Sequence, residues 1–137
     1  MPRPRHVIAV FAAVMALASA ACGGSSGDHA GDDHATLESV NEPVDGAEEV
    51  TITAADIDYR PERLELKAGE PTNVTVVNEG ESLHDFTLKE ADVHMNVDPG
   101  DEATTSVVVD SAGQFKAICS VPGHADAGMV VQVSVTQ

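Results

Sequence analysis

From about residue 49 onward, the chain consists of short runs in which apolar and polar residues alternate. The apolar members are mainly Val, Ile and Leu, and a two-residue period places them together on one face of an extended strand. Seven runs have this pattern, at residues 50–57, 63–67, 72–78, 84–89, 104–109, 114–119 and 129–136. We expect a β-strand at each of them.

Residues that favour turns, chiefly Gly, Pro, Asn and Ser, separate the runs. They lie at residues 68–71, 78–80, 98–100, 111–113 and 122–123. No segment keeps the apolar period of a helix over three turns. Seven to eight strands of this length and spacing predict an all-β fold, a β-sandwich of two sheets.

The same alternation places three side chains that can bind a metal. His84 begins the inward-facing set of the run at residues 84–89, and Cys119 ends the inward-facing set of the run at residues 114–119. Met129 begins the inward-facing set of the last run. Each of these side chains therefore lies at the end of an apolar face, where a strand meets a loop.

The first residues have the pattern of an export signal. Arg3 and Arg5 precede an uninterrupted apolar run at residues 7–18, and small residues follow before Cys22. The apolar run is shorter than the roughly 20 residues that a spanning helix needs. We therefore expect residues 1–21 to be a signal peptide, with a retained anchor helix as the alternative.

Cys22 and the Gly and Ser residues after it resemble the start of a bacterial lipoprotein. We expect Cys22 to carry lipid, which would hold the protein at a membrane surface, in the periplasm or on the outer face of the cell envelope. Ser19 stands where such signals usually have Leu, and residues 18–20 also suit ordinary signal peptidase, which is the alternative. The other cysteine, Cys119, lies in a segment of different character, so a disulfide framework is not expected.

Residues 22–48 are rich in Gly, Ser, Asp and Glu and contain no Lys or Arg. Such a segment buries too little apolar surface to offset its ordering entropy, so we expect a flexible acidic linker before a single domain at residues 49–137. The whole chain has 7 basic and 23 acidic residues, a formal net charge of -16. Nucleic acid is therefore excluded as a partner, because phosphate binding needs clustered Lys and Arg.

One segment gathers side chains with the chemistry of a copper site. Cys119, His124 and Met129 are spaced Cys-x4-His-x4-Met, with a bend at Pro122-Gly123, and His84 comes from an earlier strand. Two imidazoles, a thiolate and a thioether suit copper in a trigonal His2Cys arrangement with a weak axial Met. Zinc seldom takes a thioether, and calcium and magnesium prefer oxygen. The sequence thus predicts one type 1 copper ion.

The chain from about residue 50 to its end resembles the cupredoxins, the blue-copper family of plastocyanin and azurin. The matching motifs are RPERLELKAG at 60–69, VTVVN at 74–78, LHDF at 83–86, DPG at 98–100, CSVPGH at 119–124 and GM at 128–129. The resemblance implies a Greek-key sandwich in which His84 and His124 are equatorial nitrogen ligands. Cys119 would be the equatorial thiolate and Met129 the axial ligand. Residue 85 is Asp, whereas several members have an Asn there that hydrogen-bonds across to the copper loop, so the role of Asp85 is open.

The function that this resemblance implies is the transfer of single electrons by Cu(II)/Cu(I) cycling between extracytoplasmic redox proteins, for example a cytochrome. We expect a monomer, with His124 as the electron port. The alternative is a copper chaperone or copper buffer without an electron-transfer role. An enzyme is not expected, because copper oxidases and nitrite reductases need a second metal site and more domains than this length allows.

Three other histidines carry less specific signals. His29 and His34 lie in the acidic linker, where they would either gather Cu(II) or Zn(II) or be solvated, and we favour the second interpretation. His94 and Met95 lie in the connection before residues 98–100. They would serve either as a second, loose copper contact or in a structural or surface role, which we favour.

Overall fold

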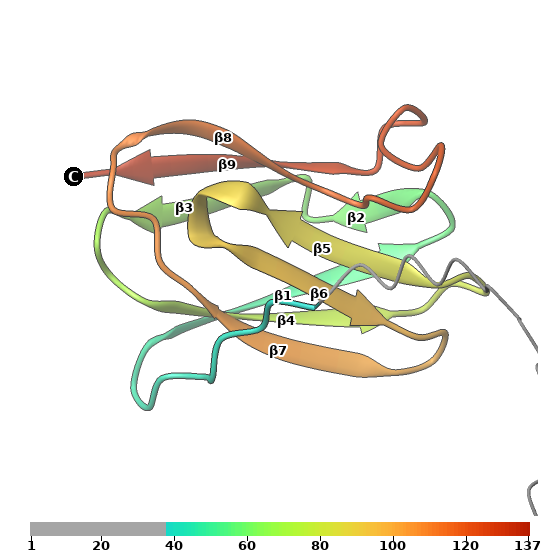
Figure 1. Cartoon of the computed structure of the whole chain (residues 1–137), viewed down its shortest axis with the longest axis horizontal. Helices are drawn as coiled ribbons and strands as arrows, with labels where there is room; N and C mark the ends of the chain where they lie inside the picture. The colour runs from blue at the N-terminus through green and yellow to red at the C-terminus, as the bar shows by residue number, and fades with distance from the viewer. Residues whose placement is uncertain (1–37) are drawn as a thin grey trace, which may run out of the picture. The chain divides into compact units, whose positions relative to one another are not determined.

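Two β-sheets packed face to face make up the protein in the computed structural model, which describes residues 38–137 (Figure 1). Within that range no helix is long and apolar enough to cross a membrane. The predictions of a signal peptide at residues 1–21, of lipid on Cys22 and of roles for His29 and His34 lie outside the described residues.

The first sheet has the strand order β2-β1-β4-β7. Its members are β1 Glu48–Ala55, β2 Asp58–Arg60, β4 Thr72–Asn78 and β7 Glu102–Val107. The second sheet has the order β3-β9-β8-β5-β6. Its members are β3 Arg63–Lys67, β5 His84–Leu88, β6 Val93–Val97, β8 Gly113–Ile118 and β9 Val130–Thr136, and a short 3-10 turn, η1, covers Lys89–Ala91.

The predicted all-β, two-sheet architecture is confirmed, with nine strands among the described residues instead of seven to eight. The two additions are β2 and β6. In β6, Val93, Met95 and Val97 are buried and alternate with partly exposed residues, as a strand requires. Met95 is thus a core side chain, and its place on a strand supports the structural role over a loose copper contact.

Mainly aliphatic side chains fill the space between the sheets. Ile52, Val74, Val76 and Val131 are fully buried there, at the alternate positions of their strands that face inward. The pattern of the sequence positions these residues because a strand side chain has only two faces to occupy. The resulting framework holds the strand ends, on which the candidate metal site is built, in a fixed arrangement.

Residues 38–47 lie against the edges of both sheets before β1 begins. The backbone N–H and C=O groups of Ser39 pair with those of His94 on β6, at 2.9 and 2.8 Å, and Asn41 Nδ2 donates to the carbonyl of Ser106 on β7 at 3.1 Å. The linker predicted at residues 22–48 therefore ends in a segment that has defined partners. Composition does not predict this, because the partners lie on distant strands and include backbone groups that any sequence can offer.

Candidate metal centre

The candidate site lies at one end of the sandwich, where β5 starts, β8 ends and the connection at residues 119–129 leads from β8 to β9 (Figure 1). Strands β5 and β8 are antiparallel neighbours, paired at Thr87 and Ile118. Because antiparallel strands place the start of one beside the end of the other, His84 and Cys119 meet although they are far apart in the sequence.

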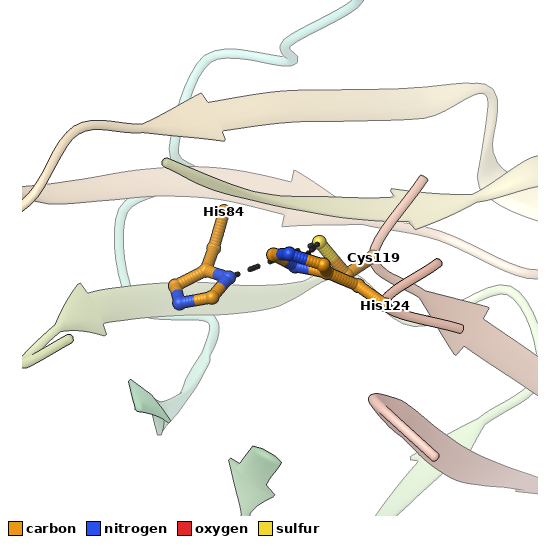
Figure 2. Close-up of side chains that lie close together, drawn as sticks. All are labelled: His84, Cys119 and His124. Carbon is orange, nitrogen blue, oxygen red and sulfur yellow. Dashed lines mark hydrogen bonds between the residues drawn. The ribbon is translucent and has the colours of Figure 1, made fainter. Parts of the chain in front are cut away.

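Figure 2 shows His84, Cys119 and His124 converging on one point. The Cys119 Sγ atom is 4.0 Å from His84 Nδ1 and 3.5 Å from His124 Nδ1. The three ligand atoms all lie within 4.8 Å of one another, and the two imidazole rings are tilted, with centroids 5.1 Å apart. His84 and Cys119 are fully buried, whereas His124 is partly exposed.

These distances fit three ligands that could hold one metal ion between them. Three ligands arranged at 120° around a metal, with bonds of about 2.0–2.3 Å, lie about 3.5–4.0 Å from one another. The two separations from Cys119 Sγ, 3.5 and 4.0 Å, match that range. Two imidazole nitrogens and one sulfur are also the donor set that copper takes in a trigonal site.

The fourth predicted residue, Met129, is fully buried and is bonded through the backbone to two of the other three, Cys119 and His124. Its carbonyl accepts a hydrogen bond from Cys119 N–H at 3.1 Å, and its N–H donates to the carbonyl of His124 at 3.0 Å. The structure thus brings all four predicted residues into one region. The assignment of the Met129 thioether as axial ligand stays a prediction.

The connection that carries His124 is closed by its own hydrogen bonds. His124 N–H donates to the carbonyl of Val121 at 3.0 Å, and Ala127 N–H donates to the carbonyl of Gly123 at 3.0 Å. Gly123 and Gly128 have φ angles of 85° and 107°, a backbone region that L side chains rarely adopt. The Pro-Gly bend seen in the sequence therefore turns His124 back toward Cys119.

Asp85 ties this connection to β5. Its carboxylate accepts hydrogen bonds from Ser120 N–H, at 3.1 and 2.9 Å to the two oxygens, and from Ser120 Oγ at 2.9 Å. The carboxylate also accepts from Thr87 Oγ1 at 2.7 Å, and its backbone carbonyl accepts from the Tyr59 hydroxyl. Asp85 thus makes a hydrogen bond across to the connection at residues 119–129, as the Asn of several cupredoxins does. The contributions of Tyr59 and Thr87 were missed, and no local motif signals them.

Burial disfavours the charged forms of two of the candidate ligands in the metal-free protein. Burial raises the pKa of the Cys119 thiol above its ordinary value, although hydrogen bonding to the thiolate opposes this. Burial lowers the pKa of His84, and the neighbouring His124 lowers it further. A neutral thiol and a neutral imidazole result, so a metal ion that binds here displaces the thiol proton.

The model of the cupredoxin-like domain family matches residues 7–131. Among characterised proteins, the chain is similar to the copper-resistant cuproprotein CopI of Pseudomonas aeruginosa, with 23% identity over 135 residues that span 63% of this chain and 75% of that one.

Two solved structures are similar in fold. Auracyanin B has a TM-score of 0.61 and 17% identity, covering 73% of this chain and 96% of its own. The metal-binding domain of the Cu(I)-exporting P-type ATPase CopA of Streptococcus pneumoniae, solved with Cu(I), has a TM-score of 0.55 and 14% identity, covering 71% and 93%. At these identities the likeness is one of fold alone.

Proposed function

The chain belongs to the cupredoxin-like domain family, and on this premise we propose that it is a type 1 copper protein that carries single electrons between extracytoplasmic redox partners. One observation carries the proposal: two imidazole Nδ1 atoms face one buried thiol at distances that suit a trigonal metal. His84, Cys119 and His124 would hold the copper ion, and Met129 would be the weaker fourth ligand.

Copper bound there would supply the redox chemistry by cycling between Cu(II) and Cu(I). The chain supplies a ligand set that changes little between the two states. His84 and Cys119 adjoin paired strands in the buried end of the sandwich, and Asp85 fastens Ser120, the residue after the thiol. Ligands held in this way reorganise little when an electron arrives or leaves, which favours rapid transfer.

His124 is the proposed point of electron entry and exit, because it alone of the four candidate ligands is partly exposed. Its neighbours Val121, Pro122 and Ala125 carry no charge, and Leu83, next to His84, is 42% exposed. A small face with few charges suits a brief encounter with a partner. The net charge of -16 would steer a basic protein, such as a cytochrome, toward the molecule. A reaction rate that stays constant or rises with added salt would contradict such steering.

The proposed location is outside the cytoplasm, with the protein acting as a monomer at a membrane surface. The apolar run at residues 7–18, followed by Cys22, supports export and lipid attachment. Mass spectrometry of the N-terminal peptide from membrane fractions tests the lipid directly. An unmodified N-terminus near Ala21 would favour cleavage by ordinary signal peptidase.

The test of the copper proposal is the visible spectrum after Cu(II) is added to the purified protein. We expect an intense blue band from charge transfer between thiolate and copper, and we expect Cys119→Ala to abolish it. His94→Asn, which changes an imidazole on the neighbouring strand β6, serves as a matched control that retains the band. A colourless wild-type protein, or a band that survives the loss of Cys119, would refute the proposal.

A copper chaperone or buffer is the second candidate function. The names of two similar proteins favour it, one a copper-resistant cuproprotein and the other a metal-binding domain of a Cu(I) exporter. Rapid transfer of copper to a chelator, without a reversible reduction potential, would support this role. Slow release with a well-defined potential would support electron transfer. Both candidates exclude substrate turnover, so a measurable oxidase activity would contradict them together.

A further inference from the structure

His94 is a nearly buried histidine that the proposed metal centre does not use. It lies on β6, and 12% of its side chain is exposed. Its Nε2 atom is buried and has no hydrogen-bond partner among residues 38–137. An apolar side chain would fill this space without burying an unpaired polar atom. The reason for an imidazole at residue 94 must therefore lie in the contacts of its Nδ1 atom.

The backbone explains why the Nδ1 side of the ring is held so close to β5. His94 lies directly opposite Thr87 on β5. Its N–H and C=O groups bond to Ser39, on the other side of β6, at 2.8 and 2.9 Å. The Thr87–His94 pair is therefore of the type without backbone hydrogen bonds, in which opposing side chains come closest. Thr87 Oγ1 lies 2.7 Å from His94 Nδ1 as a result.

The direction of this hydrogen bond follows from the number of protons. Thr87 Oγ1 has one proton and donates it to Asp85 Oδ1 at 2.7 Å, because a carboxylate only accepts. The same oxygen must then accept from His94, so the His94 ring carries its proton on Nδ1. A chain of donors runs from His94 through Thr87 to Asp85.

At its far end this chain reaches the copper loop. The Asp85 carboxylate accepts from Ser120 N–H and Ser120 Oγ, and its Oδ2 atom lies 3.8 Å from Cys119 Sγ. We propose that His94 is a positioning residue for the copper loop, acting through Thr87 and Asp85 to hold the carboxylate that fixes Ser120. The proposal rests on the proposed copper function for its consequence, but the hydrogen-bond chain exists without metal.

Four single variants of the full protein separate the parts of this chain. His94→Leu removes the donor, whereas His94→Asn keeps an N–H close to the position of Nδ1. Thr87→Val removes the relaying hydroxyl at nearly constant shape, whereas Thr87→Ser keeps it. The double variant His94→Leu/Thr87→Val tests whether His94 acts through Thr87, because residues in one chain give non-additive effects.

The first measurement is amide hydrogen exchange at Ser120 in the metal-free protein. We expect exchange to be about two- to tenfold faster in His94→Leu and in Thr87→Val, the factor that loss of one ordinary hydrogen bond gives. His94→Asn and Thr87→Ser should exchange like the wild type, and the double variant like Thr87→Val alone. The second measurement is copper release to a chelator, together with the reduction potential, which should follow the same order.

Each outcome decides the question. If His94→Leu lowers only the global stability and leaves Ser120 exchange unchanged, or if its effect persists in full in the Thr87→Val background, the proposed positioning through Thr87 is wrong, and in the second case the direct contact of 3.8 Å between His94 Nδ1 and Asp85 Oδ1 accounts for the effect. If Ser120 responds as expected but the wild type never develops the blue band, the positioning role stands and the proposed copper function fails. If copper binds normally but the copper release rate, the reduction potential and the Ser120 exchange rate are the same in all variants, only the positioning role is overturned.

Discussion

The buried carboxylate of Asp85 gives the sharpest prediction for the reduction potential. Asp85 is 1% exposed, and its Oδ2 atom is 3.8 Å from Cys119 Sγ. A negative charge there stabilises Cu(II) more than Cu(I), so it lowers the potential. Asp85→Asn removes the charge at nearly constant volume, and its amide still accepts from Ser120 N–H. We therefore expect the potential to rise.

The size of the rise follows from Coulomb's law. At an effective dielectric constant of about 20, a unit charge contributes about 4 kcal/mol at the distance of Sγ. It contributes about 3 kcal/mol at about 6 Å, the farthest that a copper ion bonded to Sγ would lie from the carboxylate. At about 2.3 kcal/mol per 100 mV, these values correspond to a rise of about 100–200 mV.

A redox titration followed at the blue band measures this difference. Asp126→Asn is the matched control, because Asp126 lies in the same connection but is exposed, where water and salt screen its charge. We expect the control to stay within about 20 mV of the wild type. An Asp85→Asn potential that is unchanged or lower, with the blue band intact, would refute the electrostatic reasoning.

Three further predictions concern the surroundings of the site. Gly80→Ala should weaken copper binding by about tenfold, because the new Cβ would lie 3.0 Å from His84 Nε2. Competition with a chelator measures the affinity, the exposed Ser82→Ala is the control, and equal affinities of Gly80→Ala and the wild type would contradict the prediction. Met129→Leu should retain the blue band and raise the reduction potential, since the thioether donates electrons to Cu(II). The unfolding free energy of the metal-free protein should change by less than about 1.5 kcal/mol. Loss of the blue band would refute this prediction. In the metal-free protein the unfolding free energy should fall as pH rises past 9.0, the ordinary pKa of a thiol, because the folded Cys119 has a raised pKa and the unfolded chain loses its proton first. Denaturant titrations of Cys119→Ala should lack this part of the alkaline loss, and identical pH profiles would count against it.

The sequence predicted seven of the nine strands and the candidate ligands of the connection at residues 119–129 because these depend on local patterns. Alternation of apolar residues fixes which side chains face inward, and it correctly placed His84 and Cys119 at strand ends. Cys119, His124 and Met129 lie within one connection, so their spacing is visible in a short stretch of the sequence. These are features in which near neighbours in the chain determine the structure.

The rest depends on pairs that are distant in the sequence. Alternation puts Asp85 on the face opposite His84, which suggests exposure, yet the carboxylate is buried against Ser120, 35 residues away. The structure has strand β6 where the sequence predicts a connection, although Val93, Met95 and Val97 alternate with polar residues as in a strand. The network from His94 to Asp85 follows only from the pairing of β5 with β6, which no local pattern records.

The segment ahead of β1 has a consequence for association between molecules. Ser39 covers β6 and Asn41 reaches β7, and these are edge strands of the two different sheets. An uncovered edge strand is a template on which another chain can add a strand, and this is a common start of aggregation. A shortened protein that begins at residue 49 would keep every candidate copper ligand and lose this cover. We expect it to self-associate more readily than one that begins at residue 38, as sedimentation would reveal.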